Sequence, residues 1–152
     1  MPNVGEQAPL FEATAQNGKT IRLTDYRGQK VALYFYPEDD TPGCTKQACN
    51  LRDNYALLQE HGIAILGVSP DDVVSHDAFA SKYTLPFQLL ADPHHTILET
   101  YGAWGEKNLY GRKYIGVKRS TFLIDEHGMI RKIFRRPKVV AHAEEILAFF
   151  HP

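Results

Sequence analysis

Two short apolar segments, residues 30–36 and 63–68, constrain the fold of this chain more than any other feature. Both have the length of a strand and are almost continuously apolar, a pattern typical of strands that are buried on both faces of a parallel sheet. Helical signals follow each of them. Because parallel neighbours need a crossover connection and helical cover on both faces, the two segments predict a layered α/β fold.

The other segments supply expected partners for these strands. An Asn17-Gly18 dipeptide, the favoured hairpin turn, joins two short strands within residues 11–23. The further elements expected are a helix over 42–60, a strand over 87–90, a helix over 96–101, loops over 102–116, a hairpin of strands 120–125 and 129–136, and a last helix over 140–150. The order predicts a thioredoxin-like sandwich: a central mixed sheet flanked by helices, preceded by an N-terminal β-hairpin.

A further helix is expected after residue 68. Ser69 has the residue type of an N-cap, Pro70 suits the first helical position, and acidic residues follow in the first turn. This helix is expected to run to residue 83. The apolar residues of its expected inner face are Val74, Ala78 and Phe79.

Composition narrows the function classes. A length of 152 residues without repeats or a long linker predicts one domain over residues 1–152. The formal net charge of −1 provides no global field for nucleic acid or an anionic membrane, and no apolar run approaches the ~20 residues of a membrane helix. No secretory signal is visible, so a cytoplasmic location is expected. Structural disulfides are rare there, which makes the two cysteines candidates for chemistry.

The first cysteine follows a helix-start pattern, Thr41-Pro42-Gly43-Cys44. Thr41 is a suitable N-cap, and Pro42 suits the first helical position because its missing N–H would be unpaired there. Cys44 then lies in the first turn, where free N–H groups and the positive helix end favour a thiolate. Since the thiolate is the nucleophile, the pattern predicts a reactive cysteine rather than a small buried apolar residue.

The second cysteine, Cys49, lies five residues further on. On a continuous helix this spacing puts the two Cα atoms about 8.7 Å apart, beyond the ~7 Å limit for a disulfide. A Cys44–Cys49 bond therefore requires residues from 41 to about 51 to leave helical geometry. A buried helix residue is the alternative interpretation of Cys49.

Other chemistries fit the sequence less well. Thiol–disulfide oxidoreductases of this fold use C-x-x-C, which closes without unwinding, and zinc sites need four ligands at closer spacing. His94-His95 has no thiol or acidic partner beside it and is expected in a loop or at a helix start. No metal site is expected.

The chain resembles the bacterioferritin-comigratory-protein (PrxQ) subfamily of peroxiredoxins over nearly its whole length. The resemblance rests on several short motifs, namely Tyr34-Phe35-Tyr36-Pro37, Thr41-Pro42-Gly43-Cys44-Thr45, Gln47-Ala48-Cys49, Leu51-Arg52-Asp53, Trp104-Gly105-Glu106-Lys107 and Arg119-Ser120-Thr121-Phe122-Leu123-Ile124-Asp125. The Thr-x-x-Cys element with a distant arginine is specific for peroxiredoxins, and the cysteine at plus five for one branch of this subfamily. By itself, Arg119 would be interpreted as a surface arginine.

The resemblance implies roles for these residues. Cys44 would attack the peroxide and become a sulfenic acid, and Cys49 would resolve it to a disulfide that thioredoxin reduces. Thr41 and Arg119 would stabilise the thiolate and the peroxide. The Gly43 and Cys44 N–H groups would contact the peroxide, and Pro42 would shield the site from water. Gln47 and Arg52 are second candidates for shaping the site; for each, a solvated helix position is the alternative. Trp104 is expected in the core.

The implied function is a cofactor-free thiol peroxidase acting on hydrogen peroxide and organic hydroperoxides, in a monomer, with a dimer as the alternative. Two other functions stay open from the sequence. One is a thioredoxin-like protein thiol–disulfide exchanger, against which the C-x4-C spacing counts. The other is a redox-responsive interaction module in which the cysteine pair only changes shape.

Overall fold

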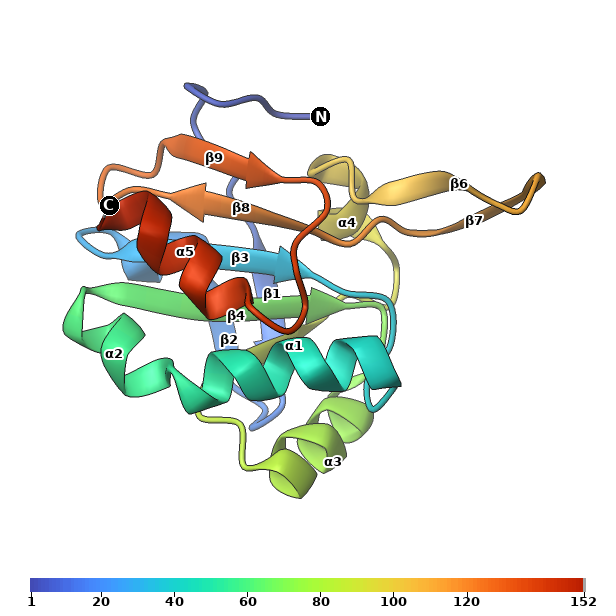
Figure 1. Ribbon diagram of the computed structural model, residues 1–152, viewed down its shortest axis with the longest axis horizontal. Coiled ribbons are helices and arrows are strands. Elements are labelled where there is room, and N and C mark those ends of the chain that lie inside the picture. Colours follow the sequence, from blue (N-terminus) through green and yellow to red (C-terminus); the bar gives the residue numbers. More distant parts are fainter. Residues whose placement is uncertain (152) are drawn as a thin grey trace.

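The computed structural model describes residues 1–151 and shows a mixed sheet covered on both faces (Figure 1). The strands are β1 (Glu12–Ala15), β2 (Thr20–Arg22), β3 (Lys30–Phe35), β4 (Ile63–Ser69), β5 (Gln88–Ala91), β6 (Trp104–Leu109), β7 (Arg112–Val117), β8 (Ser120–Ile124) and β9 (Ile130–Phe134). The helices are α1 (Pro42–Asp53), α2 (Tyr55–Glu60), α3 (Val73–Tyr83), α4 (Thr96–Thr100) and α5 (His142–Phe150), with a 3-10 helix, η1 (Leu23–Tyr26). The expected thioredoxin-like sandwich is confirmed.

Within the described part of the chain the main sheet has the order β2-β1-β5-β4-β3-β8-β9. Strands β3 and β4 are parallel, as the two apolar segments predicted, and β5 pairs parallel with β4 on its other side. Strand β8 pairs antiparallel with β3, and β9 with β8. The central position of β3 and β4 explains why their sequences are apolar on both faces.

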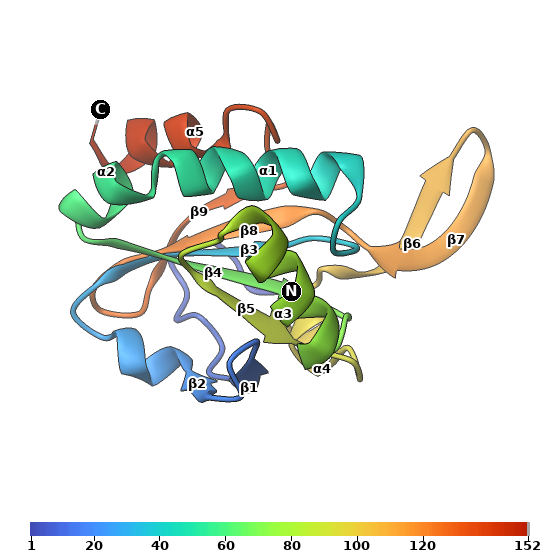
Figure 2. The same cartoon turned by 90° about the horizontal axis from the view of Figure 1, so that it is seen from below.

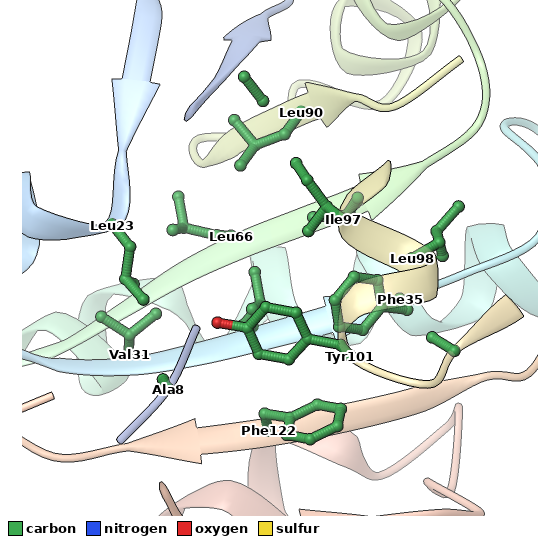
Figure 3. Close-up of a cluster of buried hydrophobic side chains, with 14 of the residues drawn as sticks. Ala8, Leu23, Val31, Phe35, Leu66, Leu90, Ile97, Leu98, Tyr101 and Phe122 are labelled. Atoms are coloured by element: carbon green, nitrogen blue, oxygen red, sulfur yellow. The ribbon is translucent and has the colours of Figure 1, made fainter. Parts of the chain in front are cut away.

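The two faces of the sheet carry two separate cores, because successive strand residues point to opposite sides. On one face Tyr34 and Tyr36 of β3 and its continuation pack against α1, α3 and α5. On the other, Val31, Leu33 and Phe35 pack against α4 and the N-terminal segment. Figure 2 shows α1, α2 and α5 over one face and α4 on the opposite side, toward which the β1–β2 edge of the twisted sheet also turns. Figure 3 shows the second core, with Tyr101 of the α4 end lying against Phe35 and Phe122.

The expected helix over 42–60 is interrupted. It ends at Asp53, and α2 starts at Tyr55 after Asn54, whose backbone leaves helical geometry at φ −109° and ψ 10°. The Asn54 Nδ2 donates to the Asn50 carbonyl at 2.9 Å. An asparagine side chain that competes for main-chain acceptors in this way disfavours a helix interior.

The expected start of α3 at Ser69 was wrong by three residues. Ser69 ends β4, and the N-cap is Asp72, whose carboxylate accepts from the Ser75 N–H at 2.8 Å. The expected inner face was also wrong in part, since Val74 is 78% exposed and Ala78 is exposed. The face that packs against the sheet holds His76, Phe79 and Ala80.

Residues 102–116 were expected to form loops, and this was wrong. Strands β6 and β7 form a two-stranded ribbon that projects from the body of the molecule (Figure 1). Tyr110 and Gly111 connect them, both with positive φ, the geometry of a tight hairpin turn. The ribbon has little buried surface, so its sequence lacks the apolar alternation that identifies a strand.

Among residues 1–151, no helix is both long and apolar enough to cross a membrane.

Candidate active site

The candidate site lies where β3 ends and α1 begins. Strand register brings Arg119 to the same place, because β8 runs antiparallel to β3 with Ser120 opposite Phe35. Arg119 is therefore one residue before the start of β8 and beside the residues that follow β3. Residues that are 75 positions apart in the chain meet at this edge of the sheet.

Cys44 is held beside a fixed positive charge. Its side chain is 2% exposed, and the Arg119 Nη2 donates to the Sγ at 3.3 Å. The other terminal nitrogen of Arg119, Nη1, donates to the Gln47 Oε1 at 2.6 Å. The site therefore holds a buried sulfur that accepts a hydrogen bond from a guanidinium, which in turn is held by a buried glutamine.

Gln47 is fully buried one turn after Cys44 and is linked to the sulfur by Arg119, which donates to both side chains. Its Oε1 fixes the guanidinium in the plane that faces the sulfur. Its Nε2 has no partner among residues 1–151. The interpretation of Gln47 as a solvated helix position was wrong, since the structure places it with Cys44 and Arg119.

The start of α1 has the expected form. Thr41 is the N-cap and Pro42 the first helical residue. A Cβ on Gly43 would lie 3.3 Å from the Arg119 Nη2, closer than ordinary contact, so glycine leaves the space that the guanidinium needs. The Thr41 hydroxyl donates to the Glu38 carbonyl at 2.9 Å instead of capping the helix. The bond from Thr41 to the sulfur stays a prediction.

Both cysteines are free, and α1 is continuous through both. Cys49 is half-buried on the same helix. The structure is therefore that of the thiol state, with the Cα separation of about 8.7 Å that five helical residues impose.

Tyr34 is a buried phenol that the motif analysis did not single out as part of the site. It belongs to the core cluster that includes Cys44, and its hydroxyl has no hydrogen-bond partner in the described chain. Burial first, and then the neighbouring Cys44, raise the pKa of Tyr34 well above its ordinary value. The phenol therefore stays protonated.

The acidic residues before Thr41 are held by other groups. The Asp39 carboxylate contacts the His76 Nδ1 at 2.7 Å and accepts from the Tyr36 hydroxyl at 2.6 Å. The Asp40 carboxylate accepts from Lys82 at 2.7 Å, and this bond holds the pKa of Asp40 below its ordinary value. Both acids are thus paired with α3 residues, which offsets the repulsion that they would exert on a thiolate.

His76 was not among the residues expected in the core or the site, although its spacing from Phe79 and Ala80 puts it on the same face of α3. It is fully buried, and its Nε2 lies 3.0 Å from the Leu90 carbonyl. Asp39, Asp71 and His76 are the described group close enough to share a metal ion. Their atoms already bond one another and nearby donors: the Asp71 Oδ2 accepts from the Asp39 N–H at 2.7 Å. The cluster is a hydrogen-bonded anchor for the loop before Cys44.

Asn50, directly after Cys49, was also missed. Helix α5 begins after Ala141, which offers no capping side chain, and the Asn50 Oδ1 accepts from the Ala143 N–H at 2.7 Å instead. The Asn50 Nδ2 donates to the Val140 carbonyl at 3.1 Å and contacts the Glu144 carboxylate at 3.2 Å. We call this set of bonds the Asn50 latch. It fastens the cysteine-bearing helix to α5.

The remaining candidates lie elsewhere. Arg52 donates to the Tyr83 carbonyl at 2.7 Å and pairs with Asp53, so it joins α1 to the end of α3 and not to the site. Trp104 is half-buried and stacks on His95, with ring centroids 3.7 Å apart. His95 precedes α4 as its N-cap, in agreement with the expected helix start.

Comparison with known proteins identifies the family to which this chain is similar. The sequence model of the AhpC/TSA family matches residues 4–133. The chain is 47% identical to a putative peroxiredoxin bcp of Coxiella burnetii over 95% of each chain, and 44% identical to the peroxiredoxin Bcp of Bacillus subtilis over 95% of this chain and 92% of the relative. A solved structure of the Xanthomonas campestris bacterioferritin comigratory protein, concerned with its alkyl peroxide reduction, superposes with a TM-score of 0.86. It is 34% identical and covers 92% of this chain and 89% of its own.

Proposed function

Because this chain belongs to the AhpC/TSA family of peroxiredoxins and is a thiol peroxidase, we propose that Cys44 is its peroxidatic residue and Cys49 its resolving residue. The observation that carries the assignment is the contact of the Arg119 guanidinium with the Cys44 sulfur, in the first turn of a helix. Cys49 has no such cation within the bonds described. Cys44 is thus the cysteine activated for attack on the peroxide, and Cys49 is the cysteine that attacks the oxidised Cys44.

The first step is attack of the Cys44 thiolate on the terminal oxygen of the peroxide. An S–O bond forms, the O–O bond breaks, and the leaving oxygen takes a proton to give water or an alcohol. Arg119 stabilises the negative charge that moves from sulfur to the leaving oxygen. The N–H groups of Gly43 and Cys44 contact the peroxide, Thr41 donates to it after leaving the Glu38 carbonyl, and Pro42 keeps water out.

The second step joins the two cysteines. The Cys49 thiol attacks the Cys44 sulfenic acid, an S–S bond forms, and water leaves. The ideal helix holds the Cα atoms about 1.7 Å too far apart for this bond, so the N-terminal turns of α1 unwind. Thioredoxin then reduces the disulfide by exchange. The protein works as a single-domain monomer on hydrogen peroxide and organic hydroperoxides in the cytoplasm, where thioredoxin is kept reduced.

One assay distinguishes this function from the two alternatives. With NADPH, thioredoxin reductase and thioredoxin present, NADPH oxidation should start when hydrogen peroxide is added. A protein thiol–disulfide exchanger would instead turn over with an oxidised protein substrate and ignore peroxide. A redox-responsive interaction module would consume peroxide at a rate near zero.

Oxidation should unwind α1 selectively. On adding one equivalent of peroxide, amide hydrogen exchange is expected to speed up over residues 42–51, because helical hydrogen bonds must open for the disulfide to close. Strand β3 should stay protected in both states. The Cys49→Ser variant is the control, since it reacts with peroxide without forming the bond. Equal protection of α1 in the thiol and oxidised states would exclude an intramolecular Cys44–Cys49 disulfide and favour an intermolecular one.

The Asn50 latch should slow this unwinding. Replacing Asn50 with Ala removes the bonds that hold α1 in its helical position. A loss of about 1 kcal/mol of net stabilisation in total corresponds to a disulfide that forms roughly five times faster. Overoxidation of Cys44 by excess peroxide should fall in proportion. Lys46→Ala is the matched control, because Lys46 is exposed on the same helix and makes no side-chain bond in the described structure. Equal rates of disulfide formation in both variants would show that the bonds of the Asn50 latch do not oppose the unwinding of α1.

A further inference from the structure

A basic cavity lies beside the candidate active site. It has a volume of about 490 Å³ and is lined by Glu106, Lys107, Asn108, Lys118, Arg119, Arg135, Arg136 and Pro137. We call it the cationic pocket. The β6–β7 ribbon, the connection to β8 and the segment after β9 form its walls, and Figure 1 shows the ribbon and the end of β9 on the same side of the molecule.

The charge of this pocket is local. Five of its eight lining residues are lysine or arginine and one is acidic, although the whole chain has 17 basic and 18 acidic residues. The single acid, Glu106, is itself 3.6 Å from the Lys113 ammonium. Within residues 1–151, no carboxylate pairs with Lys107, Lys118, Arg135 or Arg136. Like charges that are kept together without counter-ions create a field that attracts anions.

Arg119 connects the cationic pocket to the candidate active site. This arginine lines the pocket, and its Nη2 donates to the Cys44 sulfur at 3.3 Å. A molecule that contacts Arg119 in the pocket therefore touches the same side chain that holds the Cys44 sulfur. The volume exceeds what hydrogen peroxide needs, since a water molecule occupies only about 30 Å³. It leaves room for the body of an organic substrate.

Building on the function proposed above, we propose that the cationic pocket binds the carboxylate of hydroperoxides that carry one, and so selects anionic organic hydroperoxides as substrates. Lysine and arginine bind carboxylates through charge-assisted hydrogen bonds. With the carboxylate in the pocket, the peroxide group reaches Cys44. The sulfur forms its bond to the terminal oxygen, the O–O bond breaks, and the oxygen that leaves becomes a hydroxyl on the bound carboxylate molecule.

An acidic surface of the protein reductant is the competing occupant. The structure favours the small substrate because the contact between Arg119 and Cys44 exists in the thiol state, which is the state that reacts with peroxide. In the function proposed above, the reductant engages the disulfide form, whose closure moves Cys44 out of this contact.

The test compares two peroxides that differ in one charge. Pre-reduced protein, without any protein reductant, is mixed with 4-hydroperoxy-4-methylpentanoate or with its methyl ester, and Cys44 oxidation is followed over a single turnover. At about 0.01 M salt, where the Debye length is roughly 30 Å, the carboxylate should react about tenfold faster than the ester. At about 1 M salt the two rates should agree to within roughly a factor of two.

Variants locate the effect. The Lys118→Gln/Arg136→Gln double variant removes two pocket charges outside the catalytic machinery and should bring the ratio of the two rates close to one, while the ester rate is unchanged. The control, Lys19→Gln/Arg112→Gln, removes two exposed charges that do not line the pocket and should keep the ratio. Both pairs are at the surface, and equal melting temperatures check that the fold is kept.

Three outcomes would overturn the proposal. The first is equal rates for the two peroxides at low salt, and the second is a preference that survives in the double variant. The third is a salt and variant effect found only when thioredoxin reduces the oxidised protein, which would make the pocket a docking surface for that partner. If neither peroxide oxidised Cys44, the proposed function itself would fail, and this result differs from equal oxidation by both.

Discussion

The Cys44→Ser variant is expected to lose peroxide reduction, with a fall in rate of about three orders of magnitude or more, because an alcohol has no thiolate to attack the O–O bond. Serine keeps nearly the size of cysteine, and its hydroxyl can accept from Arg119, so the buried site should stay folded. The measurement is peroxide consumption in the thioredoxin-coupled assay. The circular dichroism spectrum should match that of the unaltered protein.

Cys49→Ser is the matched control for this variant, since it changes the other cysteine of the same helix. It should complete one turnover with peroxide and stop as a Cys44 sulfenic acid, which a mass increase of the Cys44 peptide would detect. Sustained thioredoxin-dependent turnover in Cys44→Ser would overturn the assignment. So would a normal single turnover in Cys44→Ser together with none in Cys49→Ser.

Removing the charge of Arg119 should have the next largest effect. In Arg119→Gln the sulfur loses a charge-assisted hydrogen bond and the cation that stabilises the leaving oxygen. Such bonds contribute about 1.5–3 kcal/mol, which corresponds to a second-order rate roughly 10 to 150 times slower. Stopped-flow mixing of the reduced protein with peroxide measures this rate.

Arg119→Lys and Gln47→Ala separate charge from orientation. Lysine keeps the charge but cannot donate to Cys44 and Gln47 from one rigid plane, so a partial recovery of rate is expected. Gln47→Ala keeps the guanidinium but frees it, and should slow the reaction less than Arg119→Gln does. An unchanged rate of reaction with peroxide in Arg119→Gln would show that the arginine takes no part in the reaction, whatever its position in the thiol state.

Much of the fold was readable from local pattern. The apolar runs predicted β3 and β4 because central strands must be apolar on both faces, and Asn17-Gly18 predicted the first hairpin because its turn needs such residues. The ribbon of β6 and β7 was missed because a pattern of burial cannot mark a strand that is barely buried. The start of α3 was misplaced because Ser69 and Asp72 both have capping chemistry, and only the pairing of Ser69 with Ala91 of β5 decides between them.

The candidate site likewise has features that local sequence predicts and features that depend on tertiary packing. By itself the sequence determined that Cys44 stands in the first turn of a helix, since Thr41 and Pro42 are local signals, and that Cys49 is too far along an intact helix to bond to it. Only the tertiary structure decided the partners of that sulfur. Arg119 reaches Cys44 through the register of β8 on β3, and Asn50 fastens the same helix to α5. Such contacts depend on how distant strands and helices pack, and packing of that range leaves no periodicity or spacing in the sequence near either residue.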